Sequence, residues 1–424
     1  MKIGAVSEKY GISRDTIYFY INYGLLVPPK HGGQQDFDEK TLADLEMILE
    51  LKKLEFSLGD IHRILSLHRV SKMASSQDIM DLKRFFTAQR DALVQRRDEL
   101  SAIVGELGRK ISTLNENARR EGITLGVPLS MLGLIRCPSC GREPEIFSAD
   151  MSVRHIYSGA LKCLCGYSAS IENGILLTPN RNVDVYDTPD LNRDMYKNLP
   201  PHLITLFERA YNRMTNRLKA AGPAGKVVME TYVNAWFFMH NHLGDLHRDG
   251  KYIVVDKYPE TLAMYKELIE CQNVGLDVLY IADSGTKLPL KNGCVDVNID
   301  FFAVNEHNFY HDTFLLNELK PYFSKDAVTI GTYFYFEKGR RSMKRLLEEY
   351  PTCSGDNFNL QRFRISMEKA GYEISGEDDC GRTDDSGDNI GFSFHEKGEE
   401  MGLLSYIARM NATPNELNKN APCR

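Results

Sequence analysis

Four of the nine cysteines in this 424-residue chain form two close pairs, the arrangement best suited to metal chemistry in the sequence. Cys137 and Cys140 stand in "RCPSCGREP", and Cys163 and Cys165 stand in "LKCLCGYSA". A glycine follows each pair and allows a tight turn that points both sulfurs at one ion. Four thiolates leave no open coordination position, so the pattern predicts a structural Zn2+ site. The alternative is four metal-free thiols.

A second set of polar side chains follows β-rich runs in the C-terminal half of the chain. Glu230 ends "KVVME", Asp256 ends "KYIVVD" and Asp283 follows "DVLYIA". The carboxyl ends of parallel strands share one edge of an α/β sheet, and such folds bind ligands there. The predicted pocket residues are Glu230, Tyr232, Asn234, Trp236, Asp256 and Asp283.

The composition is that of a folded globular protein, with 42% hydrophobic and 26% charged residues. A net charge of −6 excludes a general polycation, so any DNA-binding surface must be local. No apolar run approaches the roughly 18 residues of a membrane span, and "MKIGAVSEKYG" has no signal core. We therefore predict a cytoplasmic protein with no membrane partner.

The chain divides into four blocks and a tail that position these residues. Short helical patterns fill residues 1–72, and one long polar helix fills 75–117. The paired cysteines lie in 134–178, and helical patterns alternate with β-rich runs in 190–395. The tail, 411–424, is predicted to be disordered.

The first block is typical of helix, turn, helix and a small wing. Gly11 supplies the permissive backbone of the turn, and Ser13 can cap a helix that begins at Arg14. "GLLVPPKHGGQQDFD" predicts a two-stranded wing with a Gly-Gly tip. A short helix that opens with polar side chains after a tight turn suits the DNA major groove, so this block is a predicted DNA-reading head.

The head resembles the MerR family of transcription regulators over residues 1–72. The matching motifs are Ile3-Gly4, Gly11-Ile12-Ser13, Thr16-Ile17-Tyr18-Phe19-Tyr20, Gly24-Leu25-Leu26 and "EFSLGDI" at 55–61. The resemblance implies a dimer that binds a pseudo-palindromic site in double-stranded promoter DNA, distorts that DNA and works with RNA polymerase. The candidate DNA contacts are Lys2, Lys9, Ser13, Arg14, Thr16, Tyr18, Tyr20, Lys30, His31 and Gln35.

Arg14 is the candidate for a base edge, and Lys2, Lys9, Lys30 and His31 are candidates for phosphates. Ordinary solvated charges are the alternative for these residues, and packed core rings are the alternative for the aromatic ones.

Two departures from the family pattern concern phosphate contacts. The family has arginines where Tyr18 and the second residue of Gln34-Gln35 stand. Residues 1–72 also carry 10 basic and 10 acidic side chains, so the head has no net positive charge. Fewer phosphate contacts lower both the affinity and its salt dependence. We therefore expect DNA binding that is weaker than usual for the family, or differently placed.

The long helix carries an apolar seam with a seven-residue period. Its repeating residues are Ile79, Phe86, Leu93, Leu100, Leu107 and Leu114, interleaved with Leu82, Gln89, Arg96, Ile103 and Lys110. A lone helix cannot bury such a seam. The resemblance implies antiparallel pairing with a second copy, hence a homodimer, and packing onto another domain of the same chain is the alternative.

The cysteine block resembles the zinc ribbon that precedes the catalytic domain of some ribosomal-RNA methyltransferases. Both have a Cys-Pro-x-Cys-Gly start and an Asn-Gly-x-x-Leu-Leu-like stretch, here "ENGILL" at 172–177. The last block resembles class I S-adenosylmethionine-dependent methyltransferases, which implies that Asp256 binds ribose hydroxyls and that Asp283 lies beside adenine. In that block, "NIGFSFHEKG" at 389–398 is a predicted strand, and acidic "DDCGRTDDSGDN" at 378–389 is a predicted exposed loop.

The glycine-rich cofactor loop of that family is rewritten in this chain. Tyr232, Asn234 and Trp236 stand where the three glycines are expected, and such side chains would fill part of the cofactor space. We favour a ligand sensor whose relined cleft, with Phe237 and Phe238, holds an unknown small molecule. S-adenosylmethionine bound in an altered pose, with methyl transfer to nucleic acid or a small molecule, is the competing hypothesis. A filled cleft that only scaffolds is the third interpretation.

The predicted fold is therefore multidomain: an all-α winged helix-turn-helix head, a long dimerisation helix, a small zinc ribbon and a doubly wound, Rossmann-like α/β domain. The predicted function is ligand-responsive regulation of transcription, with the α/β domain as the effector sensor and no assigned catalytic residue.

Overall fold

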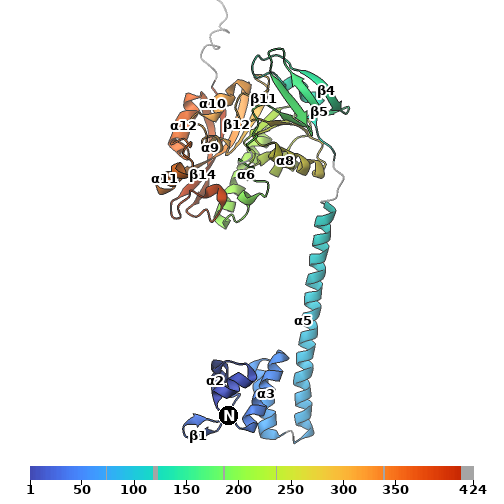
Figure 1. Ribbon diagram of the computed structural model, residues 1–424, viewed down its shortest axis with the longest axis vertical. Helices are drawn as coiled ribbons and strands as arrows, with labels where there is room; N and C mark the ends of the chain where they lie inside the picture. Colours follow the sequence, from blue (N-terminus) through green and yellow to red (C-terminus); the bar gives the residue numbers. More distant parts are fainter. Residues whose placement is uncertain (73, 118–122, 185–186, 235, 338–339, 412–424) are drawn as a thin grey trace, which may run out of the picture. The chain divides into compact units, whose positions relative to one another are not determined.

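The computed structural model describes residues 1–424 except 73, 118–122, 185–186, 235, 338–339 and 412–424. The chain forms two compact units, Met1–Arg119 and Arg120–Arg424, which are coloured along the sequence in Figure 1. The predicted disordered tail lies outside the described residues apart from Asn411. No helix in the described ranges combines the length and the apolar character needed to cross a bilayer.

The first unit begins with a helix-turn-helix and a wing. Helix α1 (Ile3–Tyr10) ends at Gly11, whose φ of 65° is the left-handed conformation that glycine adopts readily. Helix α2 (Arg14–Asn22) follows, and its N-cap Ser13 accepts a hydrogen bond from the Thr16 N–H at 3.0 Å. Strands β1 (Lys30–His31) and β2 (Gln34–Gln35) pair antiparallel around the Gly-Gly tip. The predicted winged helix-turn-helix is confirmed.

Helices α3 (Glu39–Lys53) and α4 (Leu58–Ser66) complete the core of the head. Ile17, Leu45 and Ile61 are fully buried in this core, because helical spacing places one apolar stripe of each helix inward. Asp38 and Ser57 cap the two helices.

Helix α5 (Ser76–Asn117) is one unbroken helix, drawn as the long rod in Figure 1. Its 42 residues extend about 63 Å. Its seam residues within this single chain remain exposed: Ile79 57%, Phe86 40%, Leu93 36%, Leu100 53%, Ile103 56% and Leu107 55%. The first turns of α5 contact the head, where Phe86 packs edge-on against Phe56 with ring centroids 5.2 Å apart.

The second unit is built on one mixed sheet. Five parallel strands run in the spatial order third, second, first, fourth, fifth along the chain. They are β10 (Asp277–Ala282), β9 (Lys251–Asp256), β8 (Val227–Thr231), β11 (Val295–Phe301) and β12 (Phe323–Phe336). This is the doubly wound order, and it confirms the predicted Rossmann-like α/β fold. Strand β14 (Met401–Met410) adds antiparallel to β12, and β13 (Tyr372–Thr383) adds antiparallel to β14.

Both faces of the sheet are covered. On β9, Val254 packs on one face with α6 (Pro201–Ala221) and α8 (Pro259–Gln272), and Val255 packs on the other. Residues of α10 (Leu315–Leu319) and α12 (Leu360–Lys369) belong to the second cluster. Successive side chains of a strand point to opposite faces, so strands buried on both sides are apolar throughout.

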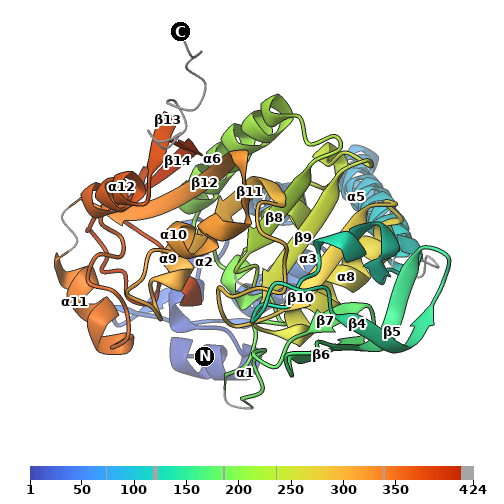
Figure 2. The ribbon, with the colours of Figure 1, turned by 90° about the horizontal axis from the view of Figure 1, so that it is seen from above.

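The cysteine region extends this sheet. Strand β7 (Ile175–Leu177) pairs parallel with β10. Figure 2 shows the strands of the cysteine region continuing the sheet beyond β7. The further strands are β6 (Ser168–Glu172), β5 (His155–Lys162), β4 (Glu145–Met151) and β3 (Val127–Pro128), all antiparallel to their neighbours. The ribbon and the Rossmann-like strands thus share one sheet.

One expectation for the last block is wrong, and a second holds for half of its residues. Residues 389–398, a predicted strand, form a 3₁₀ turn at Ile390–Phe392 and further turns, with Asn389 capping the turn through the Gly391 N–H at 2.9 Å. In the acidic stretch 378–389, a predicted loop, residues 378–383 belong to β13, whereas residues 384–389 lie outside helices and strands. Asp378 in that strand bonds Arg217 of α6 at 2.7 Å, so an ion pair offsets its poor strand preference.

Candidate functional sites of the two units

The four paired cysteines converge in the second unit. Their sulfur atoms all lie within 4.8 Å of one another, and Cys137–Cys165 and Cys140–Cys163 have Sγ–Sγ distances of 3.4 Å. Gly141 turns the first pair with a φ of 73°. Gly166 forms the turn after the second cysteine pair, with a φ of 96°. Its N–H donates a hydrogen bond to the Cys163 carbonyl at 2.9 Å.

This geometry fits a tetrahedral metal ion. Zn–S bonds of about 2.3 Å require S–S separations of about 3.8 Å, which fall inside the observed range. The four sulfurs alone satisfy four-coordination, so an ion at this site would have no position for substrate. The cluster can bind a metal ion, and its role would be structural.

A cavity of about 280 Å³ lies at the carboxyl ends of β8, β9 and β10. Four predicted pocket residues line it: Tyr232, Asn234, Asp256 and Asp283. A parallel sheet of this topology places its ligand site at this edge.

The carboxylates of Asp256 and Asp283 are held by backbone and amide donors. Asp256 accepts from the N–H groups of Asn234 at 2.8 Å and Tyr258 at 3.0 Å. Burial raises the pKa of Asp256 to about 6, against the opposing effect of these donors. Asp283 accepts from the Gly285 N–H at 2.8 Å and the Asn180 amide at 2.9 Å. Both side chains are therefore fixed in place, with part of their acceptor capacity already used.

Tyr232 has an unusual backbone for a residue with a large side chain. Its φ is 59°, in the left-handed region that glycine favours. The loop thus keeps a glycine-type conformation at the position of the first expected glycine, while a ring occupies the space. The Tyr232 hydroxyl lies 2.6 Å from Nδ1 of His307, and burial lowers the pKa of His307 to about 4. His307 is therefore neutral at pH 7.

Two predicted pocket residues lie elsewhere. Glu230 is fully buried and accepts from the N–H groups of Phe238 at 2.7 Å and Met239 at 2.9 Å, at the start of α7 (Phe238–Asn241). Trp236 packs among core rings, with Phe207 at a centroid distance of 4.7 Å. Neither residue lines the described cavity. Phe237 and Phe238 are buried in the same core cluster, so Tyr232 is the one ring of the rewritten loop that relines the cavity within the described residues.

A cavity wall that follows β11 contains residues that were not predicted from the sequence. Glu306, in α9 (Ala303–His307), and Tyr310 line the cavity, as does Lys257 after β9. Burial, followed by the charge of Asp256, raises the pKa of Glu306 to about 7. Their position in the sequence could have identified them, because these polar residues come shortly after the carboxyl ends of parallel strands.

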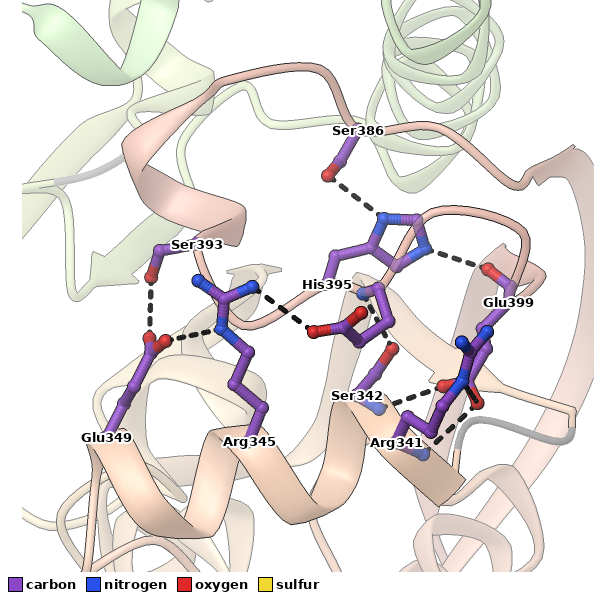
Figure 3. A network of polar contacts seen from close by, with 9 residues as sticks. Arg341, Ser342, Arg345, Glu349, Ser386, Ser393, His395 and Glu399 are labelled. Atoms are coloured by element: carbon purple, nitrogen blue, oxygen red, sulfur yellow. Dashed lines mark hydrogen bonds and ion pairs between the residues drawn. The ribbon is translucent and has the colours of Figure 1, made fainter.

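A second polar network, shown in Figure 3, is structural. The Ser386 hydroxyl and His395 Nδ1 are 3.0 Å apart, a spacing that suits an activated nucleophile. However, His395 Nε2 contacts the main-chain carbonyl of Glu399 at 2.7 Å, and Ser386 is 2% exposed. The Glu399 side chain instead accepts from the Ser342 N–H at 2.8 Å. The network therefore fastens α11 (Arg340–Glu349) to the loop before β14.

In the head, α2 presents several of the predicted DNA contacts to solvent. Arg14 is exposed, and Gly4 leaves room for its guanidinium, since a β-carbon there would lie 3.1 Å from the Arg14 nitrogen. Tyr18 is 46% exposed. Lys2, Lys9 and Lys30 are exposed, Ser13 and Thr16 form the α2 cap, and Gln35 is half-buried in β2. His31 lies in β1.

Tyr20, a predicted DNA contact, is instead a core residue of the head. It is 7% exposed and belongs to the core of the head, because it shares the inward face of α2 with Ile17. Phe19 and Tyr23 stack with centroids 5.8 Å apart and are each about half exposed. The aromatic cluster therefore divides between packing and surface.

Comparison with known proteins identifies relatives of the N-terminal region. The model of the "MerR HTH family regulatory protein" matches residues 1–67. The HTH-type transcriptional regulator ZntR homolog of Haemophilus influenzae is 34% identical over 79 residues, 18% of this chain and 58% of that protein. The HTH-type transcriptional regulator HmrR of Rhizobium leguminosarum bv. viciae is 28% identical over 101 residues, 24% of this chain and 78% of that protein. The chain thus spans less than two thirds of the first relative.

Solved structures similar to this chain include the MccD protein, with a TM-score of 0.38, 10% identity, and coverage of 47% of this chain and 96% of that one. A SAM-dependent methyltransferase from Aquifex aeolicus has a TM-score of 0.34, 17% identity, and coverage of 50% of this chain and 96% of that one. The fold of the second unit follows from its own strand order.

Proposed function

We propose that this protein, whose first 67 residues form a MerR-type helix-turn-helix domain, is a dimeric regulator of transcription that responds to a small molecule. One observation carries the proposal: a DNA-reading head and a ligand-sized cavity occur in two separate folded units of one chain. Binding at one site could then be coupled to binding at the other.

The DNA-binding part of the proposal rests on α2 and the wing. Arg14 opens an exposed helix face after a capped turn, which is the position from which a recognition helix reads base edges. The head carries equal numbers of basic and acidic side chains, so the number of phosphate contacts should be small. Footprinting of the full-length protein on its own promoter region tests this, and a dyad-symmetric protected site is expected. A footprint without symmetry, or none, would reject the regulator.

The dimer part rests on the seam of α5. A helix of 42 residues carries apolar side chains every seven positions that stay about half exposed in one chain. Pairing with a second α5 would remove this surface from water. We propose antiparallel pairing, which would hold two heads at a fixed spacing, and RNA polymerase as the further partner on the promoter.

Zinc is the metal we propose for the cysteine cluster. Four thiolates in tetrahedral spacing favour Zn2+ over harder ions such as Mg2+ or Ca2+. The site would stabilise the ribbon turns at the edge of the sheet.

The competing function is methyl transfer with S-adenosylmethionine. The cavity, which Asp256 and Asp283 line at the carboxyl ends of parallel strands, favours this alternative. The left-handed Tyr232 and its ring in the cofactor loop favour the sensor. Calorimetry of the full-length protein with S-adenosylmethionine separates the two, together with transfer assays on DNA, RNA and small-molecule fractions. Methyl transfer at enzymatic rates would replace the sensor with the enzyme, whereas binding without transfer would support the sensor.

A further inference from the structure

Helix α8 begins at the cavity of the second unit. Lys257 and Tyr258, the two residues before it, both line the cavity, and Tyr258 is its N-cap. Asp187, a further lining residue, bonds the Lys257 ammonium at 2.6 Å and the Tyr258 hydroxyl at 2.5 Å. In the first turn, the buried Thr261 donates to the side-chain oxygen of Asn234 at 2.9 Å. Because Asn234 also lines the cavity, the start of α8 is tied to the cavity wall.

The last turn of α8 holds the entry segment, residues 123–127, which follows α5 in the chain. The Glu270 carboxylate accepts from the Leu125 backbone N–H at 2.6 Å and from the Lys266 ammonium at 2.6 Å. Leu125 is 2% exposed and Lys266 is 8% exposed, so both bonds are largely shielded from water. Leu125 lies eight positions after Asn117, the last residue of α5. Helix α8 therefore binds the chain close in sequence to the end of α5.

Close packing fixes the entry segment against α8. A β-carbon on Gly174 would lie 2.6 Å from the Gly126 α-carbon and 3.1 Å from the Lys266 side chain. A β-carbon on Gly126 would lie 2.4 Å from the Ile156 carbonyl oxygen. Contacts this close leave no room for the entry segment to shift unless its neighbours shift as well. The last turn of α8 and the entry segment thus form one packed group.

Between its two ends, α8 is a single stiff element. Its 14 residues extend about 21 Å. It contacts β9, β10 and β7, beside which Figure 2 shows it. Its buried face includes the apolar side chains of Leu262 and Ile269. A helix that packs on a sheet through an apolar face can slide as a unit by a small amount, whereas its internal hydrogen bonds resist bending.

We propose that α8 transmits the occupancy of the cavity to the entry segment, and hence towards α5, with Glu270 as the residue that joins helix and segment. A ligand that separates Asp187 from Lys257 and Tyr258 would release the first turn of α8, and sliding of the helix would then move Leu125. Coupling between two sites requires an element whose state both sites influence, and α8 is bonded to both. This inference rests on the proposed function, because it names how the sensor site is coupled to the rest of the regulator.

Hydrogen exchange of the full-length protein, measured by mass spectrometry, tests this coupling without a ligand. Tyr258→Phe removes the hydroxyl bond to Asp187 at the cavity end of α8 and keeps the ring. We expect the exchange rate of the entry segment to rise at least about threefold, because loosening one end of α8 loosens the other. Exchange in β12 should stay unchanged. Substitutions as far apart as the two ends of α8 normally act independently, so an uncoupled helix would give no such response.

Two further variants assign the response to Glu270. The double variant Lys266→Met with Glu270→Leu removes the acceptor of the Leu125 N–H and leaves no unpaired charge in the protein interior. In this double variant, Tyr258→Phe should no longer change the exchange of the entry segment. Glu270→Gln keeps an oxygen acceptor for the same N–H, so the response to Tyr258→Phe should remain.

Ser130→Ala is the matched control. The Ser130 hydroxyl bonds Asp277 at the start of β10 at 2.6 Å, so it fixes the chain just after the entry segment without involving α8. The response to Tyr258→Phe should therefore survive in this variant.

Three results would overturn the proposal: unchanged exchange of the entry segment in Tyr258→Phe, an equal rise of exchange in β12, or a response that persists in the double variant. Footprinting of the wild type and the same variants separates this outcome from the proposed function. An exchange response with no DNA footprint would reject the regulator and retain the coupling through α8. A footprint without an exchange response would do the reverse.

Discussion

The left-handed backbone of Tyr232 predicts that glycine is more stabilising than alanine at this position. Residues with a β-carbon lose about 1–2 kcal/mol in this conformation. Glycine loses about 0.4–1 kcal/mol relative to alanine through the greater freedom of its unfolded chain. We therefore expect Tyr232→Gly to be about 0.8 kcal/mol more stable than Tyr232→Ala. Both variants should be about 2–4 kcal/mol less stable than the wild type, because they lose the ring and leave His307 Nδ1 without its partner.

The neighbouring residue provides the control. Thr231 lies in β8, is 5% exposed and is not among the described residues with positive φ. There the order should reverse, with Thr231→Gly about 0.5–1 kcal/mol less stable than Thr231→Ala.

Urea unfolding measures these differences in the free energy of unfolding. The fluorescence of Trp236, which is 8% exposed in the core of the second unit, follows the unfolding without a signal from the head. An alanine variant at position 232 that equals or exceeds the glycine variant in stability would refute the argument that this loop keeps a glycine-type backbone.

Three further predictions concern the other sites. The purified protein should contain about one zinc per chain by atomic emission, and Cys163→Ser should lose it; a metal-free wild type would contradict the proposed centre. Leu100→Asp should halve the mass measured by light scattering, because it places a charge in the exposed α5 seam, and an unchanged mass would exclude that seam as the interface. Burial alone would raise the pKa of Glu399, but the N–H groups of Ser342 and Arg341 lower it to about 2. This carboxylate should therefore stabilise the fold above about pH 4.5, and the stabilisation should fade as the pH drops towards 2. Glu399→Gln should flatten that acid loss, and an unaltered pH profile would show that the bonds in Figure 3 contribute nothing.

Local physics made the head predictable. The turn at Gly11, the cap at Ser13 and the Gly-Gly wing tip each depend on a few neighbouring residues, so their geometry follows from sequence. The same holds for the two cysteine pairs, where each turn is set by the glycine that follows it. The long helix was predictable because its apolar side chains recur every seven residues along its length.

The cavity was only partly predictable, because a strand end fixes the edge of the sheet and not the direction of each side chain. Asp256 and Asp283 reach the cavity directly from strand ends. Trp236 belongs to the loop that follows β8, but it packs against Phe207 of α6 and not in the cavity. Phe207 lies 29 positions earlier in the chain, and the sequence alone could not place the two rings side by side. Glu306 lines the cavity from α9, a short helix whose entry residue Phe302 has a left-handed backbone that the sequence did not indicate.

Spacing along the chain was enough to predict the main helices, most of the strands that alternate with them and the convergence of the four cysteine sulfurs. Contacts between distant segments set the features that this spacing does not encode. β13 exists as a strand because β14 supplies its hydrogen bonds and Arg217 neutralises Asp378. The strands of the cysteine region belong to the main sheet because β7 forms hydrogen bonds with the edge of β10. Edge pairing and ion pairing join residues far apart in sequence, and no local pattern encodes such partners.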